Sequence, residues 1–385
     1  MKFPKISFGE EWNNLKKFEN LSDFERSIVF YAENEASMNH FRTLIFELTE
    51  RMNFQICYIT SVKNDQILSS KNKNILSFYI GEGTARTKFF LTLRAKILVM
   101  DMPDLDRYHI KRSKAYPVHY IYLFHSMFSI HSYLRKGALD NYDTIFCVGP
   151  HHVNEIRTTE KLYGLKPKTI VNYGFGRLDT LLQEKEKFAK PDSNLKDLIL
   201  ITPSYGDENL LEKCGIELID TLLKSDFRVL LRPHFRTLRD SKELIDSIKN
   251  KFGKNPSFIF EDGVIPPEYF HNSICMISDW SGISMEYAFT FERSVIFIDV
   301  PKKILNPDAD DLPLEPIEIS IRKKIGHIVS TNNIREIPNI INNLNNNTED
   351  FKEQLKLIRQ NTVFNISTSS KIGANYIEKL IQNDS

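Results

Sequence analysis

Two histidines and an arginine follow apolar runs that have the length of buried strands. His125 comes directly after VHYIYLF at 118–124, and Arg232 and His234 flank a proline after VLL. The pKa of a free histidine is about 6.5, so its ring can accept or release a proton at neutral pH. The planar guanidinium of arginine suits phosphate oxygens. These residue types predict proton transfer at His125 and anion binding at Arg232 and His234.

Plainer structural roles exist for the same residues. His125 could cap the helix that follows it, and Arg232 and His234 could form a charged turn. Pro233 ends the strand and restricts the backbone, which holds both flanking side chains at the edge. Burying the approach to an arginine and a histidine is costly without a ligand, and this favours the functional interpretation.

The stretch MISDWSGISMEYAF at 276–289 passes from an apolar run into a helical pattern. Hydroxyls and backbone amides at a helix N-terminus can bind a phosphate, and the helix dipole favours negative charge there. Ser281 is also a plausible N-cap, and the two roles are compatible because a cap leaves other amides free. The Glu286 carboxylate could accept from a ribose hydroxyl or be solvated. The positions assigned to donor phosphate or nucleotide binding here are Ser278, Asp279, Ser281, Gly282, Ser284 and Glu286.

A second small polar loop lies in LITPSYGDENLL, between an expected strand and an expected helix. Thr202 and Ser204 provide hydroxyls, and Gly206 allows a tight turn. We assign Thr202 and Ser204 to donor phosphate or nucleotide binding.

Short apolar runs alternate with amphipathic segments along most of the chain, which predicts parallel sheets with helices on both faces. The expected strands are 27–32, 54–60, 76–81, 95–101, 118–124, 143–149, 169–174, 198–203, 227–233, 257–261, 274–278 and 294–300. The expected helices lie at about 36–51, 84–93, 151–163, 208–224, 240–251 and 282–291, from Met127, from Arg177 and over the last fifty residues. Ligands bind beyond the carboxyl ends of such strands, where the polar residues above lie.

The alternation restarts after a polar, proline-bearing segment at 184–197, which is the expected linker. We therefore expect an α/β fold of GT-B type, with two tandem doubly wound Rossmann-like domains facing each other across a cleft. The acceptor-side domain would span 1–190. The donor-nucleotide domain would span 191–385 and include the terminal helices, with the asparagine-rich tract at 341–350 as a loop.

Composition narrows the class of protein. Of the 385 residues, 41% are hydrophobic and 26% are charged, as in soluble globular proteins. The net charge of +1 argues against nucleic acid as a partner. We expect a cytoplasmic protein, because the N-terminus has no apolar signal region and no run reaches about 18 apolar residues. The four cysteines have no metal-type spacing, so we expect buried thiols and no metal site.

Residues 84–136 contain ten Lys or Arg and three Asp, with aromatic residues interleaved. The excess of positive charge is local, because the chain as a whole is nearly neutral. It could be a solvated basic face. It could also attract an anionic acceptor or an anionic lipid surface.

The order of these motifs across two α/β domains resembles the CDP-glycerol glycerophosphotransferase family, which makes teichoic-acid and capsule-type poly(alditol phosphate). The resemblance rests on His125, RPHF at 232–235 and SDWSGISMEYA at 278–288, and covers roughly residues 118–300. It implies a GT-B fold, with His125 as the catalytic base and a catalytic role for His234. It also implies that the serine-rich motif binds the donor phosphates.

The sequence departs from the family motifs at four positions. Ser126 replaces a glycine, Phe235 a proline, Trp280 a tyrosine and Gly282 a serine. The proton acceptor and the phosphate-facing groups are retained. The identity of the donor does not follow from the motifs.

The resemblance implies a transferase that moves glycerol phosphate, or a related alditol phosphate, from a CDP-activated donor to an acceptor hydroxyl. The acceptor would be a polyol phosphate or glycan, which could be lipid-linked at the inner face of the cell membrane. No protein cofactor is expected, although Mg²⁺ could bridge the phosphates. One alternative is a GT-B glycosyltransferase that uses a nucleotide sugar for capsule or lipopolysaccharide synthesis, with an epimerase as a lesser variant. Another is a non-catalytic nucleotide-binding protein.

Overall fold

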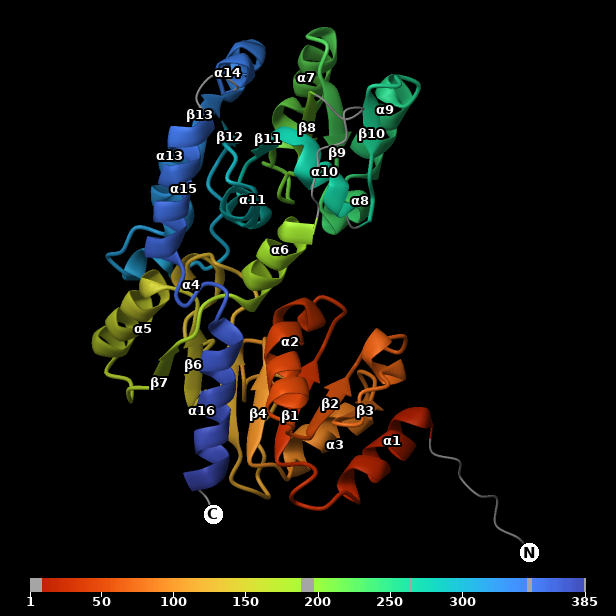
Figure 1. The fold of residues 1–385 in the computed structure, drawn as a ribbon, viewed down its shortest axis with the longest axis vertical. Helices are drawn as coiled ribbons and strands as arrows, with labels where there is room; N and C mark the ends of the chain where they lie inside the picture. The colour runs from red at the N-terminus through yellow and green to blue at the C-terminus, as the bar shows by residue number, and fades with distance from the viewer. Residues whose placement is uncertain (1–8, 188–196, 264, 345–347, 384–385) are drawn as a thin grey trace, which may run out of the picture. The chain divides into compact units, whose positions relative to one another are not determined.

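A computed structural model describes residues 9–187, 197–263, 265–344 and 348–383 (Figure 1). The chain divides into two compact units. Unit 1 comprises residues 1–180, 306–312 and 362–385, and unit 2 comprises residues 181–305 and 313–361. The expected boundary between residues 190 and 191, much of the expected linker and part of the asparagine-rich tract lie outside the described residues.

Unit 1 is built on a seven-stranded parallel sheet in the order β3-β2-β1-β4-β5-β6-β7. Its strands are β1 Ile28–Ala32, β2 Ile56–Thr60, β3 Ile75–Tyr79, β4 Ile97–Met100, β5 His119–Leu123, β6 Thr144–Cys147 and β7 Thr169–Asn172. The strand order reverses between β1 and β4, and open α/β sheets bind ligands at the carboxyl ends of the strands at such a point. Every residue of β1 and β2 is buried, as expected for parallel strands that are covered on both faces.

The helices of unit 1 follow the strands. They are α1 Glu10–Glu19, α2 Ser37–Phe46, η1 Glu47–Arg51, η2 Gln66–Ser69, α3 Thr84–Thr92, α4 Ile130–Tyr133, α5 Pro150–Tyr163, α6 Gly176–Lys187, η4 Ala309–Asp311 and α16 Ser369–Asn383. Helix α6 begins in unit 1 and continues into unit 2. The hydrophobic core lies between the sheet and the buried faces of α2 and α16.

Unit 2 is built on a six-stranded parallel sheet in the order β10-β9-β8-β11-β12-β13. Its strands are β8 Leu198–Ile201, β9 Arg228–Leu231, β10 Phe258–Phe260, β11 Ser273–Ser278, β12 Val295–Asp299 and β13 Gly326–Ser330. Its helices are α7 Leu210–Lys224, α8 Phe235–Asp240, α9 Lys242–Phe252, α10 Pro267–Asn272, α11 Ile283–Phe291, α12 Ile317–Ser320, α13 Arg322–Ile325, η5 Thr331–Glu336, α14 Ile337–Leu344 and α15 Thr348–Thr362. The order reverses between β8 and β11, which is the corresponding point of the second sheet.

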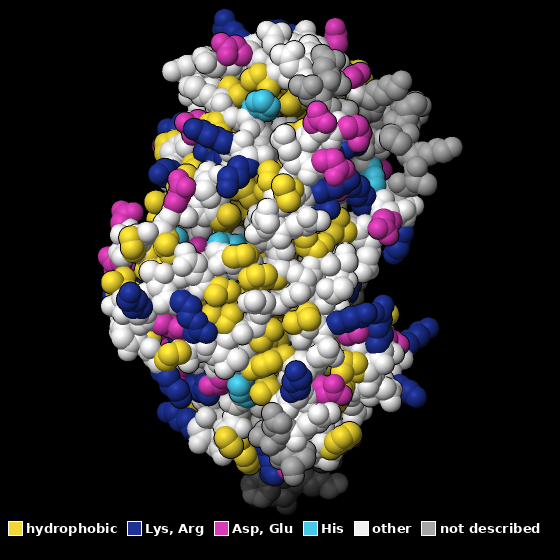
Figure 2. Space-filling model, turned by 60° about the vertical axis from the view of Figure 1, so that its left-hand side comes forward, with side chains coloured by type: hydrophobic (Ala, Val, Ile, Leu, Met, Phe, Trp, Pro, Cys, Tyr) yellow, Lys and Arg dark blue, Asp and Glu magenta, His cyan; other side chains and the backbone are white. Residues whose placement is uncertain are grey.

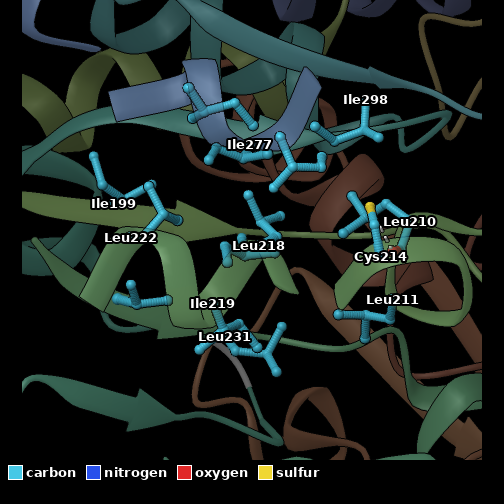
Figure 3. Packing of buried hydrophobic residues seen from close by; sticks show 14 of the residues in the cluster. Ile199, Leu210, Leu211, Cys214, Leu218, Ile219, Leu222, Leu231, Ile277 and Ile298 are labelled. Carbon is cyan, nitrogen blue, oxygen red and sulfur yellow. Dashed lines mark hydrogen bonds between the residues drawn. The ribbon is translucent and has the colours of Figure 1, made fainter. Parts of the chain in front are cut away.

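Helix α7 shows how the local sequence forms unit 2. Asn209 caps it, because the Asn209 Oδ1 atom accepts from the amides of Leu211 at 2.7 Å and Glu212 at 3.3 Å. The buried face of the helix includes Leu218 and Leu222, which pack against Ile199 of β8 and other strand residues (Figure 3). Because Asn209 caps α7, the helix starts directly after the polar loop that follows β8.

All twelve expected strands are present, but α1, α8, α10, α12, α13 and β13 were not expected. Strand β13 is an edge strand in which only Val329 is buried, so its sequence has no apolar alternation. Its first residue, Gly326, lies so close to β12 that an added Cβ would be 1.7 Å from the Val295 carbonyl oxygen.

The assignment of all terminal helices to the second domain is wrong for α16. Ala374 and Ile377 on this helix are buried in the core of unit 1. The Tyr376 hydroxyl lies 2.7 Å from the Thr144 hydroxyl on β6. Helix α16 therefore belongs to the first sheet, although it is the last helix in the chain.

Candidate functional site

The carboxyl ends of three neighbouring strands bring the predicted residues of unit 2 to one edge of its sheet. Strands β9, β8, β11 and β12 are adjacent in that order. Thr202 and Ser204 follow β8, Arg232 and His234 follow β9, and Ser278 ends β11. The structure therefore gathers residues that are far apart in the sequence.

Asp279 is buried, with an exposed fraction of 2%, and its carboxylate holds two loops together. Oδ1 accepts from the amides of Ser204 and Trp280, both at 2.7 Å, and Oδ2 accepts from Leu210 at 2.9 Å. A carboxylate repels an anion, and these amides already occupy it. Asp279 therefore orders the loops that surround the site, and its assignment to phosphate binding stays a prediction.

Several predicted hydroxyl ligands are buried. The Ser278 Oγ atom donates to the Thr202 carbonyl at 2.7 Å, and the Ser284 Oγ atom donates to the Ser281 carbonyl at 2.7 Å. Ser278 and Ser284 therefore both donate their hydroxyl protons within the protein, and their assignment as phosphate contacts stays a prediction. Thr202 is 1% exposed, and Ser204 is buried with its amide bonded to Asp279.

Helix α11 begins one residue later than expected. Its N-cap is Gly282, without a side-chain cap hydrogen bond, so the interpretation of Ser281 as the N-cap is wrong. The reason is that the Ser281 carbonyl already accepts from the Ser284 amide at 3.2 Å, which places Ser281 in the preceding turn. Ser281, Gly282 and Glu286 are each half-buried, so they keep some access to solvent.

His234 begins α8 and is held by its own helix. Its Nδ1 atom accepts from the Arg236 amide at 3.2 Å, so Nε2 carries the proton in the neutral ring. Burial, together with the nearby cations Lys303, Arg232 and Arg236, lowers the pKa of His234 to about 4. His234 is therefore neutral at pH 7 and can donate a hydrogen bond.

Three residues that the sequence interpretation missed surround His234. The Tyr205 ring lies 4.6 Å from the His234 ring, between centroids. The Arg236 guanidinium lies 4.5 Å from the Tyr205 centroid, and the Lys303 ammonium 2.9 Å from it. Tyr205 follows β8 and Lys303 follows β12, so a search for polar residues after every strand would have found them.

In unit 1, His125 lies beyond the carboxyl end of β5, and its side chain is exposed. Desolvation by the surrounding protein lowers the pKa of His125, and a hydrogen bond to the Asp101 backbone carbonyl only partly offsets this effect. The His40 ring lies 6.1 Å from the His125 ring, between centroids. Burial lowers the pKa of His40 to about 3, so this second ring is neutral.

Helix α5 holds the segment that follows His125. The His151 Nε2 atom lies 2.8 Å from the Met127 carbonyl oxygen, and the His152 Nε2 atom 2.8 Å from the Phe128 carbonyl oxygen. Glu155 accepts from the Ile130 amide at 2.5 Å. Three side chains of one helix thus hold the backbone after the predicted base.

Six of the ten cations in residues 84–136 pair with an acidic side chain of unit 1. Arg86 pairs with Glu33, Lys88 with Glu19, Arg94 with Asp23, Arg112 with Asp143, Arg135 with Asp104 and Lys136 with Asp311. On the face seen in Figure 2, Lys and Arg side chains lie among acidic and hydrophobic ones rather than in one patch. The excess of positive charge in this segment is therefore largely compensated in the folded unit.

Within the described ranges, no three or more His, Cys, Asp or Glu side chains are grouped to hold a metal ion. The four cysteines are buried, and burial raises the pKa of the Cys57, Cys214 and Cys275 thiols to about 12. In the same ranges, no helix combines the length and apolar character needed to cross a bilayer.

Solved structures with the same fold share little sequence with this chain. A putative UDP-N-acetylglucosamine 2-epimerase from Listeria monocytogenes is 13% identical, with a TM-score of 0.59 over 93% of this chain and 96% of that chain. The Neisseria meningitidis UDP-GlcNAc 2-epimerase bound to UDP-GlcNAc is 14% identical, with a TM-score of 0.57 over 92% and 100%. Anabaena Alr3699/HepE in complex with UDP and glucose is 11% identical, with a TM-score of 0.55 over 92% and 99%. These likenesses confirm the expected GT-B class.

A comparison with curated proteins found no match. The family model for CDP-glycerol:poly(glycerophosphate) glycerophosphotransferases matches residues 18–301. The match includes His125, the RPHF motif and the serine-rich motif, and it begins well before the expected limit at residue 118. Lys303 lies just beyond its end. The chain therefore belongs to the CDP-glycerol:poly(glycerophosphate) glycerophosphotransferase family, and it is a transferase of that family.

Proposed function

We propose that the protein transfers glycerol phosphate, or a related alditol phosphate, from a CDP-activated donor to an acceptor hydroxyl and releases CMP. The family match over residues 18–301 carries this proposal. The lowered pKa of His125 and the cations at the unit 2 sheet edge support it, because they suit a base and a diphosphate respectively.

The reaction forms one oxygen–phosphorus bond and breaks another. The acceptor oxygen attacks the phosphorus that carries the glycerol, and the bond from that phosphorus to the bridging oxygen of the diphosphate breaks. The proton of the acceptor hydroxyl passes to the free ring nitrogen of His125, and CMP leaves with the bridging oxygen. A lowered pKa keeps His125 unprotonated at neutral pH, as a base requires.

On the donor side, the residues act mainly by placing positive charge and hydrogen-bond donors near phosphate oxygens. Arg232 supplies a guanidinium, and neutral His234 supplies a hydrogen-bond donor rather than a charge. Ser281 and the amides at the start of α11 are half-buried and accessible to a phosphate oxygen. A Mg²⁺ ion held by the phosphate oxygens would add charge neutralisation there.

The proposed acceptor is a polyol phosphate or glycan, as in synthesis of a cell-surface polymer. An acceptor linked to lipid would bring the protein to the inner face of the membrane. The charge pairing within residues 84–136 weakens the case for that segment as the attachment surface.

The first prediction tests the reaction itself. Purified protein incubated with CDP-glycerol and a polyol-phosphate acceptor is expected to release CMP, measured by chromatography. His125→Ala should lower turnover at least 100-fold, because general-base catalysis contributes about 10²–10⁴. His327→Ala is the matched control, because His327 is an exposed histidine near the amino end of β13 in the sheet of unit 2.

A second candidate is transfer of a sugar from a nucleotide sugar. Its support is that solved structures of the same fold contain UDP-GlcNAc, or UDP and glucose. The same assay with a panel of UDP- and CDP-sugars separates the two reactions. If only a nucleotide sugar turns over, and glycerol phosphate is never transferred, the first proposal is wrong.

A further inference from the structure

A cluster of aromatic and cationic side chains lies at the carboxyl edge of the unit 2 sheet. Tyr205 is at its centre, with the His234 ring 4.6 Å from its centroid, the Arg236 guanidinium 4.5 Å away and the Lys303 ammonium 2.9 Å away. These residues come from the segments that follow three different strands, β8, β9 and β12. Only the sheet order brings them together.

The cations of this cluster have no free carboxylate to neutralise them. Arg236 and Lys303 form no ion pair with any residue in the described ranges. The Asp279 carboxylate attracts Lys303, but backbone amides already occupy it. The cations of residues 84–136, in contrast, are mostly paired with acids. Half-buried cations that face one another repel, unless an anion binds between them.

We propose that Tyr205, Arg236 and Lys303 complete, with Arg232 and His234, a binding site for the diphosphate of the nucleotide donor. The identity of this ligand rests on the proposed function. The anion site itself rests on Arg236 and Lys303, which form no ion pair in the described ranges. Tyr205 positions the two cations through contact with its ring face, and the cations bind the phosphate oxygens.

The charges around Lys303 give this site a characteristic pH dependence. The pKa of Lys303 is lowered to about 8, mainly by burial and also by the nearby Arg236 charge, with Asp279 partly offsetting both. The other groups near the cluster are neutral His234, Arg232, the Tyr205 ring and, on the helix of Arg236, the Asp240 carboxylate, whose pKa Arg239 and Arg236 lower. A bound diphosphate favours the charged ammonium and raises the pKa of Lys303. The protein therefore takes up protons on binding near pH 8, and affinity falls as pH rises above 8.

Calorimetric titration with CDP tests this second prediction without any turnover. At pH 8, the measured heat should vary with the ionisation enthalpy of the buffer and indicate uptake of up to about half a proton, because a group of pKa about 8 is then half protonated. Lys303→Ala should weaken CDP binding about tenfold and abolish the uptake. Lys302→Ala is the matched control, because Lys302 is exposed and adjacent in sequence.

The Lys303→Arg variant distinguishes the effect of the positive charge at this position from the effect of its loss as the pH rises. Arginine stays protonated, so this variant should keep most of the affinity but lose both the proton uptake and the fall in affinity between pH 7 and pH 9. Arg236→Ala should also weaken CDP binding about tenfold, without abolishing the proton uptake. Inorganic pyrophosphate should compete with CDP in wild-type protein and compete poorly in Lys303→Ala.

Two results would overturn the inference. One is that Lys303→Ala and Lys302→Ala bind CDP alike, and the other is that wild-type protein binds neither CDP nor pyrophosphate. Failure of the proposed function gives a different result, in which CDP or UDP binds through Lys303 but CDP-glycerol is not turned over. The two failures are therefore distinguishable.

Discussion

His125 and His234 both have lowered pKa values, but their surroundings give them different chemistry. His125 is exposed and donates to a backbone carbonyl, so one ring nitrogen is free to accept a proton. His234 accepts from a backbone amide through Nδ1, which leaves an Nε2–H that can only donate while the ring is neutral. The first ring suits a base and the second suits binding of a phosphate oxygen.

The third prediction, at the scale of a residue, concerns Asp279. Asp279→Ala leaves three backbone amides without their carboxylate, so we expect unit 2 to lose about 2–4 kcal/mol of unfolding free energy. Urea denaturation measures this loss. Asp207→Ala is the control, because Asp207 is exposed in the same loop. Equal stability of the two variants would show that Asp279 does not hold the loops.

At the scale of an element, the first turns of α5 determine the conformation of the segment after His125. His152 is fully buried, accepts from the Val148 amide through Nδ1 at 3.3 Å, and lies against the Phe128 carbonyl through Nε2. Nδ1 can accept this hydrogen bond only while the His152 ring is neutral, and Nε2 then carries the proton that faces the Phe128 carbonyl. Burial accordingly lowers the pKa of His152 well below its usual value.

The fourth prediction follows from this neutral ring. The unfolded chain binds a proton at His152 below pH about 6.5 and the folded protein does not, so His152 makes stability fall as pH drops below that value, by about 1.4 kcal/mol per pH unit. His152→Asn lacks this contribution, and urea denaturation at pH 7.5 and 5.5 should show a smaller decrease in stability. If wild-type protein and His152→Asn lose equal stability between pH 7.5 and pH 5.5, the prediction is wrong.

The His152→Asn variant can also be tested for activity. Because α5 lies in unit 1, His152→Asn should lower turnover through the His125 segment while CDP binding to unit 2 stays unchanged. His151→Asn tests the neighbouring contact with the Met127 carbonyl in the same way. A parallel loss of CDP affinity would mean that the substitution perturbs the whole fold.

At the scale of the whole molecule, the last part of the chain packs against the sheet of unit 1. Residues 362–369 pass so close to the backbone of unit 1 that a Cβ at Gly149 would be 1.8 Å from the Thr362 carbonyl oxygen. Gly174 has a φ of +107° and faces the Phe364 carbonyl oxygen. Asp179 then binds the Ser369 amide and hydroxyl at the start of α16.

The fifth prediction tests where α16 belongs. Ile377→Ala removes a fully buried side chain and should cost about 2–4 kcal/mol. Hydrogen exchange should rise in α2, β6 and β7, which lie in unit 1, and stay unchanged in unit 2. Ile372→Ala is the control on the same helix, because Ile372 is 36% exposed. Faster exchange only in unit 2 would place α16 with the second sheet.

The sequence by itself determined the features that depend on neighbouring residues. Strand and helix alternation, the polar residues after strands and the family motifs are all local patterns, and they predicted the GT-B class, His125 and the RPHF motif. They also indicated that the chemistry lies beyond the carboxyl ends of the strands. Edge strand β13, with one buried residue, left no such pattern.

Tertiary structure alone decided which polar groups are free. Sheet order brings Tyr205, Arg236 and Lys303 together, although they lie about 100 residues apart at the extremes. The fold also pairs the cations of residues 84–136 with distant acids, and it buries Ser278 and Asp279, which sequence alone assigned to phosphate. The physical reason is that charge compensation and burial depend on non-local neighbours, and a linear motif contains no information about them.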